Sequence, residues 1–423
     1  MDSHQSSIRP CKALTLRGKM LLWITRMLVG FLSVLTGTPR KHPIEFEENS
    51  LNMTAKELLY FAFKYYVKNV SNGNKFGYLK LPAGYKSYHP SIPSELKLHI
   101  GGDLMPYKLI QEKHCEQFWL ERKDFFKADI VAANLETPID IDRKEQLVPE
   151  IMLSNMHFNG NLEQFNIFSG FPDSKGYDVL SLANNHSLDM GYAGMVNTTS
   201  FLHQRNIQTC GIGKPNERHC IIDKNGFKIG FISWTYSLNH LKPNEEEPFN
   251  VNVLPLNKIE GCSIKEIEAE AKRLKKEGAD YIIGMLHCGN AYQPYPGKQT
   301  QKLFERIAHE TDVNFIIGGH PHNIQPLQEF KTSKGPVVAA YSLGDFIAYD
   351  IYQRCHLSIY LEINLARIHN QVQLINFKIH RNYIELKNQA LRLRNFDDVK
   401  KERPFDKKIA DLQQLYRQTI SGN

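Results

Sequence analysis

Short apolar runs alternate with helix-like stretches along the middle of the chain. The runs are rich in residues that favour strands, and the stretches between them show helical spacing or turn-forming residues. This alternation predicts an α/β core built from layers of sheet and helix. The expected strands cover residues 96–100, 130–133, 179–182, 229–233, 281–286, 315–317 and 337–341.

Two stretches carry clear helix signals, and the C-terminal part carries a strand signal. Apolar residues recur at helical spacing in residues 263–278, and Gly278 can end that helix. A second helix is predicted over residues 54–67, where Thr54 is the N-cap and Glu57 makes a capping box. Alternating apolar residues near the C-terminus predict a β-meander: Leu357, Ile359, Leu361, Ile363, Val372, Leu374 and Phe377.

These patterns divide the chain into four expected segments. Residues 1–43 form a basic and apolar leader, and residues 44–96 form an N-terminal extension. Residues 97–350 form the main α/β domain, and residues 351–423 form the β-meander and a polar tail.

The leader leaves the location of the protein open. Its apolar stretch, residues 20–37, contains one charge, Arg26, and a central Arg costs about 2.5–3.5 kcal/mol on membrane-insertion scales. A clean membrane span is therefore not expected, whereas basic residues upstream allow an anchor or a signal sequence. The alternative is an amphipathic helix that lies on the protein or on a membrane surface. We expect a cytoplasmic or a membrane-associated protein.

Composition narrows the class of protein. Of 423 residues, 42% are hydrophobic and 23% charged, which excludes a disordered chain. The formal net charge is +7, and the charged residues are scattered along the chain, so we expect no nucleic-acid partner. The positive charge suits an anionic small molecule or polymer as substrate. The seven Cys form neither an even set nor a CxxC pair, which indicates reduced thiols. The oligomeric state stays open.

Polar residues with metal-binding side chains follow five of the expected strands. Open α/β sheets usually place their sites at such strand ends. The pair His320 and His322 is the strongest signal, because two imidazoles two residues apart in extended backbone face the same way. Mixed imidazole, carboxylate and amide ligands suit one or two Zn, Mn or Fe ions. The residues at the other strand ends are Asp103, Asn134, Glu136, Asn184, Asn185, His186, Asp189 and His287.

Six ordered motifs connect these residues to a known family. They are GDLM at 102–105, ANLETP at 133–138, LANNHSLDMG at 182–191, HCGNAY at 287–292 with Pro296, GGHPH at 318–322 and YSLGDF at 341–346. In these motifs the sequence resembles the CapA-type proteins of capsule (poly-γ-glutamate) synthesis, whose domain looks like a divergent calcineurin-type metallophosphatase. The resemblance implies a metallophosphatase-like sandwich of two mixed β-sheets flanked by helices over residues 97–350.

The resemblance also implies roles for individual residues. His186 would be the general acid near the leaving oxygen. The implied ligands are Asp103 and His322 for one ion, Glu136 as the bridging carboxylate, and Asn185, His287 and His320 for the second ion. The residues expected to support these ligands or to contact substrate are Asn134, Asn184, Asp189, Tyr292 and Asp345.

Three departures from the family pattern, and one from metallophosphatases that the family shares, bear on activity. Cys288 and Ala291 stand where the family usually has Trp and Glu, and Asp345 stands where it usually has Asn. Met105 replaces a metallophosphatase His, as in the family generally. The missing Glu removes a side chain that would support the site or contact substrate.

The sequence therefore favours a metal-dependent hydrolase, in which a metal-activated water attacks a phosphoester or related bond. The alternative is a non-catalytic, metal-containing component that binds, exports or anchors an anionic polymer. A thiol hydrolase built on Cys288 and His287 is disfavoured, because neighbours in a strand point to opposite faces.

Overall fold

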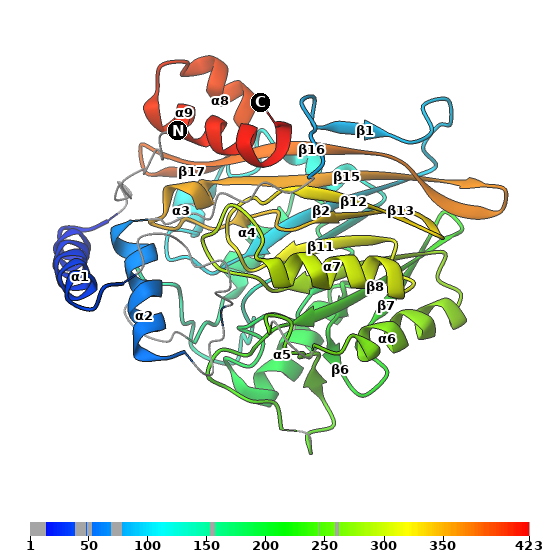
Figure 1. Cartoon of the computed structure of the whole chain (residues 1–423), viewed down its shortest axis with the longest axis horizontal. Coiled ribbons are helices and arrows are strands. Elements are labelled where there is room, and N and C mark those ends of the chain that lie inside the picture. The colour runs from blue at the N-terminus through cyan, green and yellow to red at the C-terminus, as the bar shows by residue number, and fades with distance from the viewer. Residues whose placement is uncertain are drawn as a thin grey trace.

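Two mixed β-sheets pack face to face and form the body of the protein in the computed structural model (Figure 1). The structure describes residues 14–38, 48, 53–68, 78–152, 157–244, 246–258 and 262–422. Apolar side chains from the facing sides of both sheets, such as Ile100 and Ile130 from one and Ile283 and Phe315 from the other, form one shared core. Burial of these side chains is the main force that holds the two layers together.

The first sheet combines parallel strands with an antiparallel meander. Its strands are β1 (Tyr85–Ser87), β2 (Leu96–Leu104), β3 (Ile130–Leu135), β4 (Val179–Ser181), β5 (Gln208–Cys210), β14 (Asp345–Ile347), β15 (Leu357–Ile368), β16 (Gln371–Lys387) and β17 (Ala390–Asn395). The main order is β1-β16-β15-β2-β3-β4-β5, with β14 also on β2 and β17 on β16. Strands β2 to β5 are parallel, and β15 to β17 are antiparallel.

The second sheet is also mixed. Its strands are β7 (Cys220–Lys224), β8 (Phe227–Thr235), β10 (Tyr281–His287), β11 (Phe315–Gly319), β12 (Leu327–Thr332) and β13 (Gly335–Ala340). Their order is β12-β13-β11-β10-β8-β7, with parallel pairing between β8, β10, β11 and β13 and antiparallel edges. A short pair, β6 (Ile212–Gly213) and β9 (Asn250–Val251), stands apart.

Helices cover the outer faces of the two sheets. Residues of α4 (Leu162–Ser169) and α5 (Gly191–His203) share an apolar cluster with the outer face of the first sheet. Residues of α6 (Lys265–Lys276) and α7 (Lys298–Glu310) do the same for the second sheet. The shorter segments are α3 (Glu112–Cys115), η2 (Lys123–Lys127) and η3 (Gln353–His356).

This architecture confirms the predicted α/β class, the two mixed sheets flanked by helices and the C-terminal meander. Each expected strand is present within a few residues of its predicted ends, and the helix expected at 263–278 is α6. The helix expected at 54–67 is α2 (Ala55–Ala62), which continues into a π-helical turn, η1 (Phe63–Val67). Thr54 and Glu57 form the capping box.

The end of the chain, expected as a polar tail, forms helices that bury apolar side chains. They are α8 (Phe396–Glu402), α9 (Lys407–Tyr416) and a final turn, η4 (Arg417–Ser421). Val399, Ile409 and Leu412 are buried in the core that the sheets share. This apolar face was not predicted from the sequence, because charged residues surround the apolar ones there.

The described part of the leader contains one long helix, α1 (Leu16–Leu35), beside α2 (Figure 1). In the described part of the chain, it is the one helix long and apolar enough to cross a membrane, judged by length and composition alone. Its exposed face carries large apolar side chains, among them Trp23, Met27 and Phe31. Arg26 lies inside the apolar run and donates from Nε to the carbonyl oxygen of Tyr66 at 2.8 Å.

Candidate metal centre

The candidate site lies where parallel strands of both sheets end. Strands β2 and β3 of the first sheet and β10 and β11 of the second carry or precede the motif residues at their carboxyl ends. Because β2 runs parallel to β3 and β10 runs parallel to β11, the carboxyl ends of these strands meet at one rim. Side chains more than 200 residues apart in sequence are thereby brought into contact, as the 3.1 Å hydrogen bond from the His320 amide to Asp103 Oδ2 shows.

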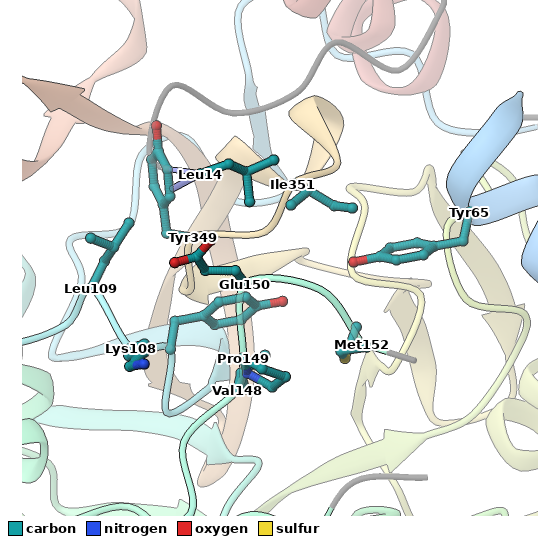
Figure 2. A pocket seen from close by; sticks show the side chains of 11 residues that line it. Leu14, Tyr65, Lys108, Leu109, Val148, Pro149, Glu150, Met152, Tyr349 and Ile351 are labelled. Carbon is teal, nitrogen blue, oxygen red and sulfur yellow. The ribbon is translucent and has the colours of Figure 1, made fainter. Parts of the chain in front are cut away.

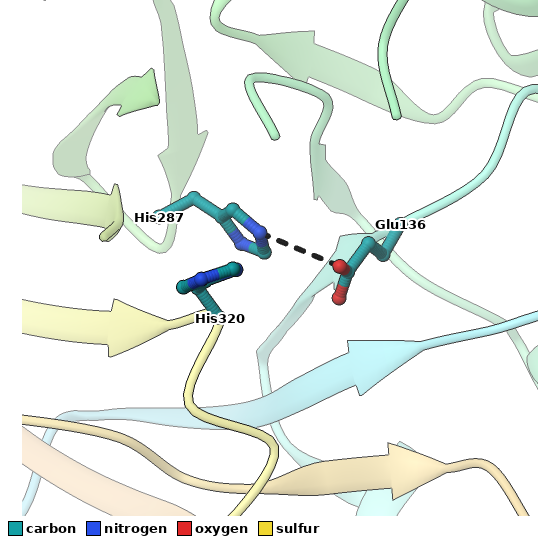
Figure 3. Close-up of side chains that lie close together, drawn as sticks. All are labelled: Glu136, His287 and His320. Atoms are coloured by element: carbon teal, nitrogen blue, oxygen red, sulfur yellow. Dashed lines mark ion pairs between the residues drawn. The ribbon is translucent and has the colours of Figure 1, made fainter. Parts of the chain in front are cut away.

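A first group of potential metal ligands consists of Glu136, His287 and His320 (Figure 3). One ligand atom of each lies within 4.8 Å of the others, and all three side chains are buried. His287 Nε2 lies 3.4 Å from Glu136 Oε1, and the rings of His287 and His320 are 5.1 Å apart. A carboxylate and two imidazoles at this separation are a donor set that zinc, manganese or iron accepts.

A second group consists of Asp103, His322 and Asp345, whose ligand atoms also lie within 4.8 Å of one another. Strand β14 sets Asp345 directly beside Asp103 on β2. His322 Nδ1 lies 2.8 Å from Asp345 Oδ1. The sequence analysis expected Asp345 to support ligands or to contact substrate. It lies among the potential ligands instead, because the parallel pairing of β14 with β2 brings the Asp103 and Asp345 carboxylates together.

Asn134 connects the two groups. Its Nδ2 donates to Asp103 Oδ1 at 2.8 Å and lies 3.3 Å from His287 Nδ1. Asn184 holds Asn134 in turn, with Nδ2 donating to Asn134 Oδ1 at 3.2 Å and to the carbonyl oxygen of Leu135 at 2.8 Å. The six potential ligands therefore belong to one continuous polar cluster.

The backbone around the histidine pair takes unusual conformations. His320 and His322 have φ of 90° and 56°, in the left-handed region that residues with a Cβ rarely adopt. A Cβ at the preceding Gly319 would lie 2.8 Å from Asp103 Oδ1 and 3.2 Å from His287 Nδ1, so glycine is required there. Strained backbone of this kind persists only where its surroundings impose it, and it is common at functional sites.

Buried polar atoms without a hydrogen-bond partner indicate whether the cluster fits a cation. Within the described residues, both carboxylate oxygens of Glu136, His320 Nδ1 and Asp345 Oδ2 are buried without a hydrogen-bond partner. Leaving a buried charged group unpaired costs several kcal/mol. Carboxylate oxygens and an imidazole nitrogen are ligand atoms, so a divalent cation is a group that satisfies them together. The residues present therefore fit one or two metal ions.

Burial and the neighbouring carboxylates shift the pKa values of these groups in different directions. Burial lowers the pKa of His287 to about 3, so its imidazole is neutral and offers a lone pair. Burial and the neighbouring Glu136 raise the pKa of Asp103. Burial alone would lower the pKa of His322, but the carboxylates of Asp345, Glu136 and Asp103 raise it well above its usual value.

Asn185 and His186 approach the first group from the loop after β4. Asn185 Oδ1 lies 2.9 Å from His287 Nε2, and Asn185 Nδ2 donates to Asn239 Oδ1 at 3.0 Å. His186 Nδ1 lies 2.7 Å from Asp189 Oδ2, and the ring stacks on Phe158 at 4.2 Å. Burial would lower the pKa of His186, but Asp189 raises it.

Tyr292 lies beside the second group, with its ring 5.4 Å from that of His322. Its φ is 61°, and its amide donates to the carbonyl oxygen of Pro321 at 2.8 Å, which ties the loop after β10 to the histidine pair. The structure thus gathers all twelve residues selected from the sequence at one rim. Cys288 is buried.

Sequence reasoning missed Glu48, which the N-terminal extension inserts into this cluster. Glu48 Oε1 lies 3.2 Å from His320 Nε2, and Oε2 accepts from the Ala291 amide at 2.9 Å. Burial would raise the pKa of Glu48, but His320, Lys64 and the Ala291 amide lower it to about 2. Nothing in the sequence around residue 48 signals this contact, because its partners lie about 240–270 residues away in the chain.

A cavity of about 80 Å³ lies one aromatic layer from the second group (Figure 2). Tyr65 lines it, and the Tyr65 ring lies 4.7 Å from that of Tyr292. The hydroxyls of Tyr65 and Tyr107 both donate to Asp350, which fixes this wall. The remaining lining residues are Leu14, Lys108, Leu109, Val148, Pro149, Glu150, Met152, Tyr349 and Ile351.

Comparison with known proteins gives consistent matches over the same region. Residues 97–350 match the family model described as bacterial capsule synthesis protein PGA_cap. The chain is 23% identical over 266 residues to the PGA biosynthesis protein CapA of Bacillus subtilis (strain 168), covering 62% of this chain and 64% of that protein. It is 25% identical over 224 residues to the capsule biosynthesis protein CapA of Bacillus anthracis, covering 52% and 50%. The matches thus span half to somewhat under two thirds of these relatives.

Among solved structures, the chain is similar to the calcineurin-like phosphoesterase YfkN from Bacillus subtilis. That similarity has a TM-score of 0.38 and 14% sequence identity, and it covers 76% of this chain and 98% of the other.

Proposed function

The chain belongs to the bacterial capsule synthesis protein family, as its motifs predicted, and from this premise we propose that it is a metal-dependent hydrolase of a phosphoester or related bond. The observation that carries the proposal is the buried Glu136 carboxylate, which has no hydrogen-bond partner among the described residues and lies beside His287 and His320. When bound, one or two divalent ions of Mn, Zn or Fe would lower the pKa of a coordinated water and neutralise charge on the departing group.

Seven residues would hold the ions. Glu136, His287 and His320 form one ligand group, with the amide oxygen of Asn185 next to His287. Asp103, His322 and Asp345 form the other. Asn134 keeps the two groups together by its hydrogen bond to Asp103.

His186 is proposed as the general acid. Asp189 accepts a hydrogen bond at His186 Nδ1 and raises the pKa of the imidazole, so the ring holds a proton that Nε2 can give to the leaving oxygen. Phe158 stacks on the ring and limits its rotation. No protein nucleophile is needed, because water supplies the attacking oxygen.

The substrate class proposed is an anionic small molecule or polymer. Membership of a capsule synthesis family supports an anionic polymer, and the net charge of +7 is compatible with it. We also propose that α1 holds the protein at a membrane surface, since its exposed face is apolar.

Two substitutions separate metal binding from catalysis. His320→Ala removes an imidazole from the first group, so metal content after loading with Mn²⁺ and dialysis should fall together with hydrolysis of phosphoester and γ-glutamyl substrates. His186→Ala should leave metal content unchanged and lower the rate about 100- to 10,000-fold, the usual contribution of general acid catalysis. His309→Ala, an exposed histidine on α7, is the matched control and should change neither quantity.

The outcome also tests the non-catalytic alternative. Ala291 lacks the carboxylate of the family motif, which favours a component that binds an anionic polymer without cleaving it. If His186→Ala matches the unmodified protein in every hydrolysis assay, the hydrolase proposal fails and the polymer-binding role takes its place.

A further inference from the structure

The backbone of Glu48 is fixed to the loop that follows β10. Its amide donates to Asn290 Oδ1 at 2.8 Å, and its carbonyl oxygen accepts from Asn257 Nδ2 at 2.9 Å. Asn257 also bonds both the amide and the carbonyl oxygen of Gly289 at 2.8 Å. A residue of the N-terminal extension is therefore built into the same loop that carries the HCGNAY motif.

The carboxylate of Glu48 is buried and fully engaged. Its Oε2 accepts from the Ala291 amide at 2.9 Å, and its Oε1 lies 3.2 Å from His320 Nε2 and 3.4 Å from the hydroxyl of Tyr236. Lys64 Nζ, also buried, donates to the Ala291 carbonyl oxygen at 2.7 Å, so a positive charge lies close by. The carboxylate thus lies against Ala291, the position at which the sequence lacks a Glu.

The contact with Glu48 determines which nitrogen of His320 carries the proton. An ionised carboxylate only accepts hydrogen bonds, so His320 Nε2 must be the donor. With Nε2 engaged by Glu48, Nδ1 is the nitrogen whose lone pair is left for another partner. In the described part of the molecule, Nδ1 is buried without a hydrogen-bond partner, and His320 belongs to the ligand group with Glu136 and His287.

We propose that Glu48 is a positioning residue for His320: its carboxylate fixes the ring orientation and the tautomer that leave Nδ1 free to bind the cation. A carboxylate that accepts from the non-ligating nitrogen of a metal-bound imidazole typically contributes 10- to 100-fold to metal affinity. The inference rests on the metal centre of the proposed function, but not on hydrolysis. It assigns the N-terminal extension a part in the site.

The test uses Glu48→Gln in the full-length chain. An amide has one oxygen, so Gln cannot accept from both the Ala291 amide and His320 Nε2 as Glu48 does. In the metal-free protein, the ¹⁵N shifts of His320 should show hydrogen on Nε2 in the unmodified chain and a mixture of tautomers in the variant. Calorimetric titration with Mn²⁺ should show about 10- to 100-fold weaker binding.

A matched control is Glu270→Gln. Glu270 is also a buried glutamate that accepts hydrogen bonds, from Trp234 at 2.6 Å and from Asn252 at 3.3 Å, but it is not a member of either ligand group. Its substitution should leave the His320 tautomer and Mn²⁺ affinity unchanged. If Glu48→Gln fails to fold, Glu48→Asp keeps both acceptor oxygens and should retain the tautomer with a smaller loss of affinity.

A double-mutant cycle with His320→Ala separates positioning from direct ligation. If Glu48 acts through His320, Glu48→Gln should weaken Mn²⁺ binding no further in the His320→Ala background. A further loss there would show that Glu48 is itself a ligand and would overturn the proposal, as would an unchanged tautomer in Glu48→Gln. Protein that binds Mn²⁺ but hydrolyses no substrate would refute the proposed function and leave this inference standing.

Discussion

At the scale of single residues, Gly319 is the position where the site leaves no room for a side chain. A Cβ there would meet Asp103 Oδ1 at 2.8 Å and His287 Nδ1 at 3.2 Å. We predict that Gly319→Ala displaces one of these potential ligands and lowers Mn²⁺ affinity at least tenfold, with a loss of about 1–3 kcal/mol in the free energy of unfolding. Titration calorimetry and urea denaturation measure the two effects.

The matched control for Gly319→Ala is Gly30→Ala, inside α1, where an added Cβ meets nothing within 4 Å. That change should leave Mn²⁺ affinity unaltered and stabilise the protein by up to about 1 kcal/mol, because alanine favours helix. Unchanged Mn²⁺ affinity in Gly319→Ala would mean that neither Asp103 nor His287 is a ligand.

At the scale of elements, Glu362 on β15 binds the two neighbouring strands together. Its Oε2 accepts from His380 Nε2 on β16 at 2.9 Å and lies 3.7 Å from His99 Nε2 on β2. The hydrogen bond from His380, and then the nearby His99 imidazole, lower the pKa of Glu362 well below its usual value. The carboxylate is therefore ionised in the folded protein at pH values at which it is protonated in the unfolded chain.

From this pKa shift follows a pH-dependent prediction. The stabilisation is fully present above the unfolded pKa of about 4.5 and is lost as pH falls through the folded value. Glu362→Gln should lower the free energy of unfolding at pH 7 by about 1–3 kcal/mol, and the difference from the unmodified protein should shrink below pH 4.5. Urea denaturation at several pH values measures it.

Glu268→Gln is the control for this prediction, because Glu268 forms an exposed pair with Lys272 within α6. Such pairs contribute a few tenths of a kcal/mol, so this change should have little effect at any pH. A stability difference for Glu362→Gln that is equally large at pH 7 and pH 3 would refute the role given to its charge.

At the scale of the whole molecule, helix α1 lies at one side of the sandwich (Figure 1). Helix α1 buries only Gly18, Leu22, Val29 and Ser33, so its removal should cost the core little. We predict that a chain beginning at Pro43, which keeps Glu48, still unfolds cooperatively. The same chain should lose sedimentation with vesicles of phosphatidylcholine and phosphatidylglycerol, because the exposed apolar face is gone.

A substitution within the full-length chain controls for the truncation. Trp23→Asp changes an exposed side chain of α1 and should also reduce sedimentation with vesicles while leaving the unfolding transition in place. Loss of cooperative unfolding in the truncated chain would show that α1 is part of the core. Unchanged sedimentation of both variants would refute the membrane role of the helix.

Structural features that depend on residues close together in the sequence were determined by the sequence alone. Strand and helix periodicity is local, so the strands of both sheets, α6 and the capping box at Thr54 were predictable. The motif residues were found for the same reason, because each follows its strand within a few positions. The apolar face of α8 and α9 was not predicted, because charged residues dominate the sequence of these helices.

Only the tertiary structure decided how these parts meet. Asp345 joins Asp103 and His322 through the pairing of β14 with β2, a register that no local pattern specifies. Glu48 reaches His320 across 272 residues of chain, and its backbone is fixed by Asn257 and Asn290. Such contacts depend on long-range burial and hydrogen bonding, which exist only once the two sheets have packed. The sequence therefore determined which motif residues follow the strands, and the fold determined which residues touch.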